Sequence, residues 1–555
     1  RAELETILSL DDKKQLTPIL SVMQMTSSSP LFSFGPEADL KDSKVNALYI
    51  GQSGIGMGDR DYYLDAENES IREAYKTYLN RLFTLAGLEE SQVSKATDAV
   101  MRIETELAKN MRSNVELRDL QRMYNPMATA DLKKNYDAID WKYLFDFAKI
   151  NPERVIVCQP EYMEALDKLI ETTPIEDLRY YLASQYLNAA APYLDDNFYA
   201  ASFDFYGRTM SGKQEPRPRW KRAMAIPNSA LGEAVGEMYV EKFFPAEDKA
   251  RMMTLVENLR TALGQHIDQL DWMSDSTKMR AREKLAAFHV KIGYPDKWKD
   301  YSTLEIDPTL SYWENIQRAS EWATRDQLAK VGKAVDPEEW LMTPQTVNAY
   351  YNPTTNEICF PAAILQPPFF NPAADDAVNY GAIGVVIGHE MTHGFDDQGR
   401  QFDKDGNMNN WWTDADAFKQ KTDILVKQFD AIEVLPARGD QPAVFANGSL
   451  CLGENIADQG GLRVAYTALM NTLNGTEPEP IDGLTPAQRF YLSYATVWAQ
   501  NIRDEEIARL TKLDVHSLGQ WRVDATLRNL QDFFDAFNIT DGKMYMPVEE
   551  RVIIW

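Results

Sequence analysis

Two of the five histidines in this chain lie within residues 386–395, in the pattern His-Glu-x-x-His. His389 and His393 are four residues apart, so on a helix they share one face and can bind a single metal ion. Glu390 directly follows His389 and cannot share that metal position. It is placed instead to take a proton from a zinc-bound water, as a general base. The pattern therefore predicts a hydrolytic zinc site on a helix.

The alternative is that both histidines are ordinary core residues with satisfied hydrogen bonds. The apolar residues 382–387 would bury such a helix with or without a metal. For two histidines at this spacing alone we would favour the core interpretation. The intervening Glu390 and a candidate third ligand favour the zinc site.

A catalytic zinc needs a third protein ligand and one open position, and a carboxylate is one of the observed solutions. The segment 452–462 offers Glu454 and Asp458, which are four residues apart and share one helical face. We expect Glu454 to bind the metal, and Asp458 to hydrogen-bond a ligand histidine on its non-metal nitrogen. The alternative is a solvated acidic helix start, where glutamate complements the helix dipole. The sequence thus predicts one Zn²⁺ per chain, bound by His389, His393 and Glu454.

The sequence resembles the neprilysin family of zinc metallopeptidases, to which endothelin-converting enzymes and bacterial PepO-type oligopeptidases belong. The matching stretches occur in family order and cover nearly the whole chain: 59–64 (DRDYYL), 292–296 (IGYPD), 347–351 (VNAYY), 360–370 (FPAAILQPPFF), 396–399 (DDQG), 454–458 (ENIAD) and 514–516 (DVH). The resemblance implies an α+β, mainly helical fold, in which a thermolysin-like zincin catalytic domain faces a large helical domain and encloses a central cavity. It also implies a zinc-dependent endopeptidase that cuts oligopeptides before large hydrophobic residues.

The resemblance gives roles to residues whose purpose spacing does not reveal. His516, oriented by Asp514, resembles the family histidine that donates to the oxyanion forming on the scissile carbonyl. Arg522 resembles the arginine that binds the P1′ carbonyl region of the substrate. The alternative for Arg522 is a surface salt bridge, the commoner fate of an arginine. With Glu390 as the base, these residues predict attack by a metal-activated water rather than by a covalent nucleophile.

Two further sets of residues resemble substrate-binding positions. Asn348 and Ala349 resemble the strand segment that pairs with the substrate backbone, and residues 347–351 and 357–361 flank a Pro/Asn turn, which predicts a hairpin. An exposed edge strand is a template for an extended peptide. The residues that resemble the S1′ pocket lining are Ile364, Phe369, Val386, Val497 and Trp498. By residue type alone they would be ordinary core.

The pattern along the chain predicts two domains. Up to about residue 310, apolar residues recur at helical spacing, as in 71–79 and 255–260, and no metal motif occurs. The remainder, 311–555, holds the hairpin, the zinc helix and every proposed catalytic group. We therefore expect a mainly helical domain over 1–310 that caps the active-site cavity, and a catalytic domain over 311–555.

Composition narrows the function classes. The chain has 555 residues with 58 basic and 84 acidic side chains, a formal charge of −26, so nucleic acid is an improbable partner. Three cysteines argue against a disulfide framework and favour a bacterial form over the disulfide-rich mammalian relatives. No stretch approaches the roughly 18 apolar residues of a membrane span. The competing classes are a non-catalytic peptide-binding protein with the same fold, which would not need Glu390, and a different metal hydrolase.

The chain opens on Arg1 and lacks an apolar targeting run. By comparison with the family it starts inside the ectodomain, so we expect a fragment or a processed chain. The missing part would carry targeting or a lipid anchor and an arginine that reads the substrate's C-terminal carboxylate. We expect a monomer that acts on oligopeptides in the periplasm or at the cell surface of a bacterium.

Overall fold

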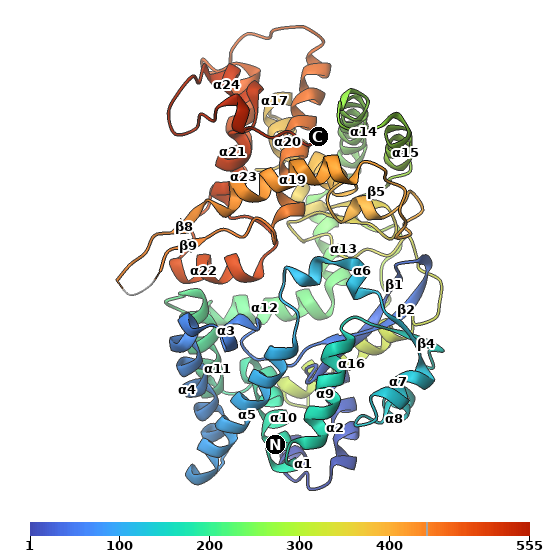
Figure 1. Ribbon diagram of the computed structural model, residues 1–555, viewed down its shortest axis with the longest axis vertical. Coiled ribbons are helices and arrows are strands. Elements are labelled where there is room, and N and C mark those ends of the chain that lie inside the picture. The colour runs from blue at the N-terminus through green and yellow to red at the C-terminus, as the bar shows by residue number, and fades with distance from the viewer. Residues whose placement is uncertain (440–441) are drawn as a thin grey trace.

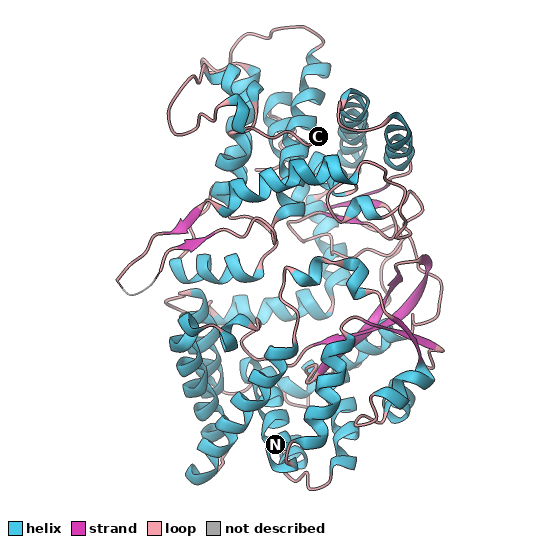
Figure 2. Cartoon of the chain, in the orientation of Figure 1, coloured by secondary structure: helices cyan, strands magenta, loops and turns pink. Residues whose placement is uncertain are grey.

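The computed structural model describes residues 1–439 and 442–555. Most of these residues form helices, and strands account for a much smaller part of the chain (Figure 2). Two separate clusters of buried apolar side chains hold the molecule together. We call the parts built around them the first lobe, residues 1–212 with 311–331, and the second lobe, residues 232–294 with 349–555. In Figure 1 the first lobe lies below and the second lobe, with the C-terminus, above. This mainly helical architecture agrees with the predicted fold class.

The first lobe packs amphipathic helices around one mixed sheet. Its sheet has the order β1-β2-β4-β3, in which only the β2–β4 pair is parallel. Its strands are β1 (Phe32–Asp39), β2 (Asp42–Gln52), β3 (Pro126–Ala128) and β4 (Arg154–Val157). Its helices are α1 (Ala2–Leu8), α2 (Leu16–Thr26), α3 (Asp61–Leu64), α4 (Glu69–Leu85), α5 (Glu90–Asn110), α6 (Leu120–Met123), α7 (Thr129–Asn135), α8 (Trp141–Ala148), α9 (Pro160–Thr172), α10 (Ile175–Ala190), α11 (Asp196–Ser202) and α16 (Tyr312–Leu328).

The predicted helical spacing in this half is confirmed by α4, which buries Tyr75, Tyr78 and Leu79 against the lobe core. The later helix α16 begins at a capping box. Ser311 accepts from the backbone N–H of Glu314, whose carboxylate accepts from the N–H of Ser311. Such reciprocal caps satisfy N–H groups that a helix start leaves without partners.

The second lobe surrounds a three-stranded sheet with the order β5-β7-β6, so β6 lies at an edge. The strands are β5 (His289–Gly293), β6 (Tyr350–Asn352) and β7 (Glu357–Pro361); β8 (Glu433–Leu435) and β9 (Val444–Phe445) form a separate ribbon. The helices are α13 (Gly232–Phe243), α14 (Ala246–Gln269), α15 (Asp275–Ala286), α17 (Asp376–Asn379), α18 (Val385–His393), α19 (Ala415–Asp430), α20 (Leu452–Leu473), α21 (Pro486–Val497), α22 (Asp504–Leu513), α23 (Gly519–Leu527) and α24 (Gln531–Phe537). Between the lobes runs α12 (Arg219–Ala230), which buries none of its residues.

The chain crosses between the lobes more than once. Helices α14 and α15 precede residue 310 and contribute to the second core, whereas α16 follows it and contributes to the first. The two lobes are defined by these cores. A domain boundary near residue 310 stays a prediction.

The hairpin predicted around residues 352–356 is present, but its first strand is shorter than expected. Tyr350 pairs with Cys359 and Asn352 with Glu357, in antiparallel register. Continuing that register would place Asn348 opposite Pro361, which has no N–H to donate, and the chain turns into a 3₁₀ helix immediately after it. Asn348 and Ala349 therefore precede the ladder instead of belonging to it.

Helices α18 and α20 touch at their backbones, which sets the position of the site. A Cβ atom on Gly461 of α20 would lie 2.5 Å from the backbone nitrogen of His389, and one on Gly388 of α18 would lie 2.8 Å from the carbonyl oxygen of Gly461. No larger residue fits at either position without moving the helices. This close approach brings the first turn of α20 beside the histidines of α18.

Candidate zinc centre

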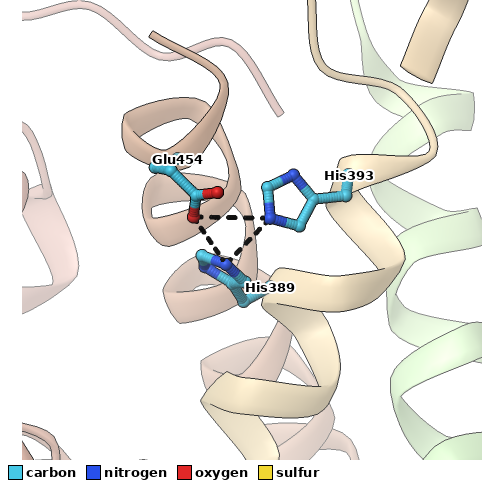
Figure 3. A group of neighbouring side chains, drawn as sticks. All are labelled: His389, His393 and Glu454. Atoms are coloured by element: carbon cyan, nitrogen blue, oxygen red, sulfur yellow. Dashed lines mark hydrogen bonds and ion pairs between the residues drawn. The ribbon is translucent and has the colours of Figure 1, made fainter. Parts of the chain in front are cut away.

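The two histidines of α18 and the first turn of α20 meet at one point (Figure 3). The Nε2 atoms of His389 and His393 are 3.0 Å apart, and Glu454 Oε2 lies 3.1 Å from the first and 3.5 Å from the second. Zinc held tetrahedrally at about 2.0–2.1 Å would separate its ligand atoms by roughly 3.3 Å. The spacing of these three atoms therefore fits a zinc ion.

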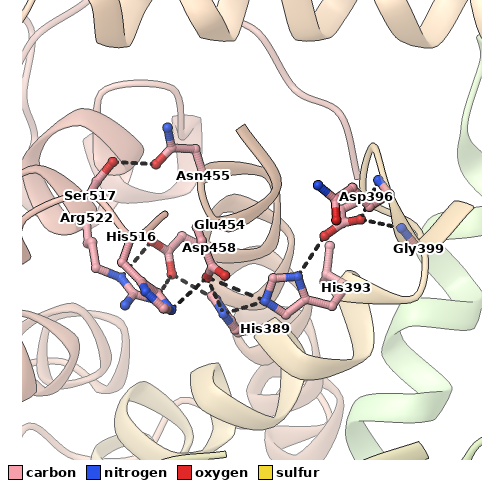
Figure 4. Close-up of polar contacts among 12 residues, drawn as sticks. His389, His393, Asp396, Gly399, Glu454, Asn455, Asp458, His516, Ser517 and Arg522 are labelled. Atoms are coloured by element: carbon pink, nitrogen blue, oxygen red, sulfur yellow. Dashed lines mark hydrogen bonds and ion pairs between the residues drawn. The ribbon is translucent and has the colours of Figure 1, made fainter. Parts of the chain in front are cut away.

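Each ligand histidine is bound on its other nitrogen by a carboxylate (Figure 4). His389 Nδ1 lies 2.9 Å from Asp458 Oδ1, and His393 Nδ1 lies 2.7 Å from Asp396 Oδ2. In a neutral imidazole the single N–H then points to the carboxylate, so both Nε2 atoms present lone pairs. Glu454 Oε2 is buried beside them without a hydrogen-bond donor among the residues described. Three converging acceptors repel one another, and a divalent cation is the group that satisfies them.

Asp396 is a further residue of the candidate site, and sequence reasoning did not assign it. It lies after the end of α18, where the chain folds back so that its Oδ1 accepts the N–H groups of Gln398 and Gly399, at 2.9 and 2.6 Å. These bonds aim the other oxygen at His393. Its position three residues after His393 was the available signal, but the side-chain direction depends on a turn that spacing does not reveal.

Arg522 is buried, so the surface salt bridge considered for it is wrong. From α23 it donates through Nε and Nη2 to the two oxygens of Asp458, at 2.9 and 2.7 Å, and its guanidinium stacks 3.8 Å from the ring centre of Trp498. Burial disfavours the cation, but Asp458 outweighs burial and raises the pKa of Arg522. Asp458 therefore links Arg522 to His389 in one buried network.

Glu390 is buried on α18 and lines the same cavity as the histidines. Burial raises the pKa of its carboxyl above the ordinary value, while the neighbouring imidazoles of His389 and His393 act in the opposite direction. A raised pKa is typical of carboxylates that exchange protons near neutral pH.

His516 lies on the loop between α22 and α23 and lines the same cavity. Its Nδ1 is 2.7 Å from Asp514 Oδ1, and its Nε2 is 3.3 Å from Glu454 Oε2. The imidazole is thus directed into the site by Asp514. The structure brings together all the histidines and carboxylates that the sequence analysis assigned to it.

A cavity of about 910 Å³ extends from this centre. Its wall includes Asn348 and Ala349 beside the edge strand, and all five residues compared with an S1′ pocket: Ile364, Phe369, Val386, Val497 and Trp498. Asn114, Leu117 and Arg118 reach it from the first lobe. Both lobes therefore line one space around the candidate zinc ligands.

The described part of the chain contains no disulfide, since Cys158, Cys359 and Cys451 are free. Among residues 1–439 and 442–555, no helix has the length and apolar character needed to cross a membrane.

Comparisons with known proteins agree with this geometry. The signatures of peptidase family M13 match residues 1–295 and 348–553. Human endothelin-converting enzyme 1 is 36% identical over 542 residues, which are 94% of this chain and 69% of that protein. A neutral endopeptidase of Lactobacillus helveticus is 32% identical over 100% of this chain and 83% of its own. The crystal structure of the Mycobacterium tuberculosis zinc metalloprotease Zmp1 in complex with an inhibitor superposes with a TM-score of 0.96, at 39% identity, over 100% of this chain and 85% of that one. The chain belongs to peptidase family M13 and is a metalloendopeptidase of that family.

Proposed function

We propose that this protein is a zinc-dependent endopeptidase that hydrolyses short peptides, with His389, His393 and Glu454 as the zinc ligands and Glu390 as the general base. The observation that carries the proposal is the convergence of three metal-ligand atoms at the spacing of a tetrahedral zinc site, beside a buried carboxylate that lines a cavity. A protein that only binds peptides would have no use for Glu390.

Zinc bound there would act as a Lewis acid that polarises the scissile carbonyl and acidifies the attacking water. Glu390 takes the proton of that water and passes it to the leaving amine, so one carboxyl serves as base and then as acid. Burial, which raises the pKa of Glu390, makes its protonated form accessible after the first transfer.

Two side chains are placed to stabilise the oxyanion. Asp514 Oδ1 lies 2.7 Å from His516 Nδ1 and holds the ring so that Nε2 faces the site. Arg522 uses Nε and Nη2 for Asp458, which leaves Nη1 for the P1′ carbonyl region. Because Asp458 and Trp498 hold the guanidinium in place, little rotamer entropy is lost when it binds substrate.

The edge strand β6 and the residues before it supply the peptide-binding surface. An extended substrate would pair with the backbone at Asn348 and Ala349 and place its P1′ side chain among Ile364, Phe369 and Val497. The apolar character of these residues supports a preference for large hydrophobic P1′ residues.

We also propose that the first lobe selects substrates by size, because Asn114, Leu117 and Arg118 close one side of the cavity. A peptide must then fit wholly inside. Cleavage rates should fall as a peptide with one common scissile site is lengthened from ~5 to ~100 residues. Rates independent of length would contradict the enclosure and leave the zinc chemistry intact.

The proposed function is tested by metal analysis combined with a peptide digest. The purified protein should contain about one zinc, and Glu454→Gln, which removes the anionic ligand but keeps its size, should lose most of it. Digestion of a mixed peptide library, read by mass spectrometry, should show cuts before large hydrophobic residues. A zinc-loaded protein that binds peptides without cutting them would favour the non-catalytic alternative.

We propose that this is a bacterial member of the family, because the free cysteines argue against the disulfide-rich mammalian form. From the resemblance to the family we also propose a monomer that acts outside the cytoplasm. Light scattering of the purified protein and fractionation of cells that produce it test the two parts of this proposal.

A further inference from the structure

Helix α15 carries a lysine whose ammonium group is sealed inside the second lobe. Lys284 is 1% exposed, and its Nζ lies 2.7 Å from the carbonyl oxygen of Gly394, 2.7 Å from that of Gly399 and 2.8 Å from that of Phe402. The rings of Tyr351, Phe395 and Trp411 surround it at 5.6–5.8 Å from their centres. Lys284 itself is not a candidate zinc ligand and does not line the cavity.

All three carbonyls belong to the turn that follows the zinc helix. Gly394 is the C-cap of α18, immediately after His393, and helix ends leave carbonyl oxygens that need donors. Gly399 donates its N–H to Asp396 at 2.6 Å, and Asp396 in turn binds His393 Nδ1. Lys284 therefore fixes the backbone on both sides of the carboxylate that orients a zinc ligand.

The turn packs directly against the end of α18. A Cβ atom on Gly399 would lie 1.7 Å from the carbonyl oxygen of His393, so the two backbones are in direct contact. Lys284 also accepts, through its own carbonyl, the amide of Asn356 in the β6–β7 turn at 3.2 Å. One residue thus joins the zinc turn to the edge-strand hairpin.

A buried ammonium is unfavourable in an apolar environment. Taking an ammonium out of water carries a large desolvation penalty, which a methionine of similar length would avoid. Burial lowers the pKa of Lys284 to about 7. The three carbonyls favour the ammonium form, because each accepts one hydrogen and a neutral amine has only two. The three hydrogen bonds to the carbonyls offset this desolvation penalty, which indicates that the lysine serves to hold those carbonyls in place.

We propose that Lys284 is a positioning residue for the zinc site: its ammonium holds the turn 394–402 so that Asp396 presents its carboxylate to His393. The proposal rests on the zinc site proposed above, and it concerns the affinity of that site for metal rather than the chemistry of the reaction. Lys284 touches neither substrate nor metal.

The test is Lys284→Met in the full chain, which keeps the stem and removes the donors. Lys278→Met, a second lysine of α15 with its Nζ on the exposed side, is the matched control. Zinc affinity is measured by competition with a chromophoric chelator at a temperature where each variant gives native circular dichroism. Loss of an orienting partner typically weakens metal binding 10- to 100-fold, and we expect a loss of about that size for Lys284→Met and none for the control.

A purely structural role would lower the unfolding midpoint of Lys284→Met but leave the zinc affinity of its folded form unchanged, and that result would overturn the proposal. At saturating zinc, kcat and KM of Lys284→Met should approach those of the wild type, because the substitution weakens the affinity for metal and leaves the reaction chemistry intact. If the wild-type protein itself binds no zinc, the proposed function fails before this test begins, so the two failures are distinguishable.

Hydrogen exchange on the wild-type apoprotein keeps the proposal testable if Lys284→Met does not fold. The amides of Gln398 and Gly399, which bind Asp396, should exchange slowly without metal, because Lys284 holds the turn already. Fast exchange at both amides would show that the turn is not fixed before zinc binds, and would overturn the proposal.

Discussion

Replacement of Asp458 by Asn should weaken zinc binding and destabilise the metal-free protein at the same time. Asp458 accepts from His389 on one side and from two nitrogens of Arg522 on the other, and it is only 2% exposed. An amide of the same shape has one acceptor oxygen, so an NH₂ group must face a donor. Losing the charge leaves Arg522 buried without its counterion, which costs about 3–5 kcal/mol. Losing the orientation of His389 should weaken zinc binding ~10- to 100-fold.

Asp396→Asn is the matched comparison, because Asp396 orients the other ligand histidine but pairs with no arginine among the described residues. Both variants should weaken zinc binding, measured by chelator competition. Only Asp458→Asn should strongly lower the midpoint of thermal unfolding in excess chelator, where zinc contributes nothing. Equal midpoints for the two metal-free variants would refute the assignment of Arg522 to a buried pair with Asp458.

Two further predictions concern the first lobe. Burial raises the pKa of Glu104 to about 7, although Tyr63 and Tyr75 donate to it. The folded state therefore holds a proton that the unfolded state loses above about pH 4.5, and its contribution to stability falls by roughly 3 kcal/mol between pH 4.5 and 7. Glu104→Gln should remove that fall, and equal pH profiles of chemical denaturation for the two proteins would contradict it. Arg118 of the first lobe binds Asp397 of the second at 2.7 Å, so Arg118→Met should loosen the lobes and raise the radius of gyration in X-ray scattering; an unchanged scattering curve would show that the pair does not hold them.

The parts of the site that the sequence predicts are those fixed by local helical geometry. His389 and His393 share a face of α18, and Glu454 and Asp458 share a face of α20, because each pair is one turn apart. Backbone hydrogen bonds set that spacing, so no knowledge of the tertiary structure is needed.

The parts that the sequence does not reveal depend on chain segments that meet only in the folded protein. Arg522 lies 64 residues from Asp458, and Lys284 lies 110 residues from Gly394, so their pairings leave no periodic signal. The first strand of the hairpin begins later than expected because its partner reaches Pro361, a limit that depends on register. Asp396 belongs to one of the stretches that match the family, but the direction of its side chain depends on the turn that Gly399 and Lys284 hold.

Turnover by Glu390→Gln, measured together with its zinc content, tests the central claim most directly. The amide keeps the size of the side chain and removes the base. Glu390 supplies none of the three candidate ligand atoms, which come from His389, His393 and Glu454. The variant should therefore keep about one zinc per chain and cleave a reporter peptide ~10²- to 10⁴-fold more slowly than the wild type. Near-parental turnover with zinc retained would contradict the assignment of Glu390 as the general base.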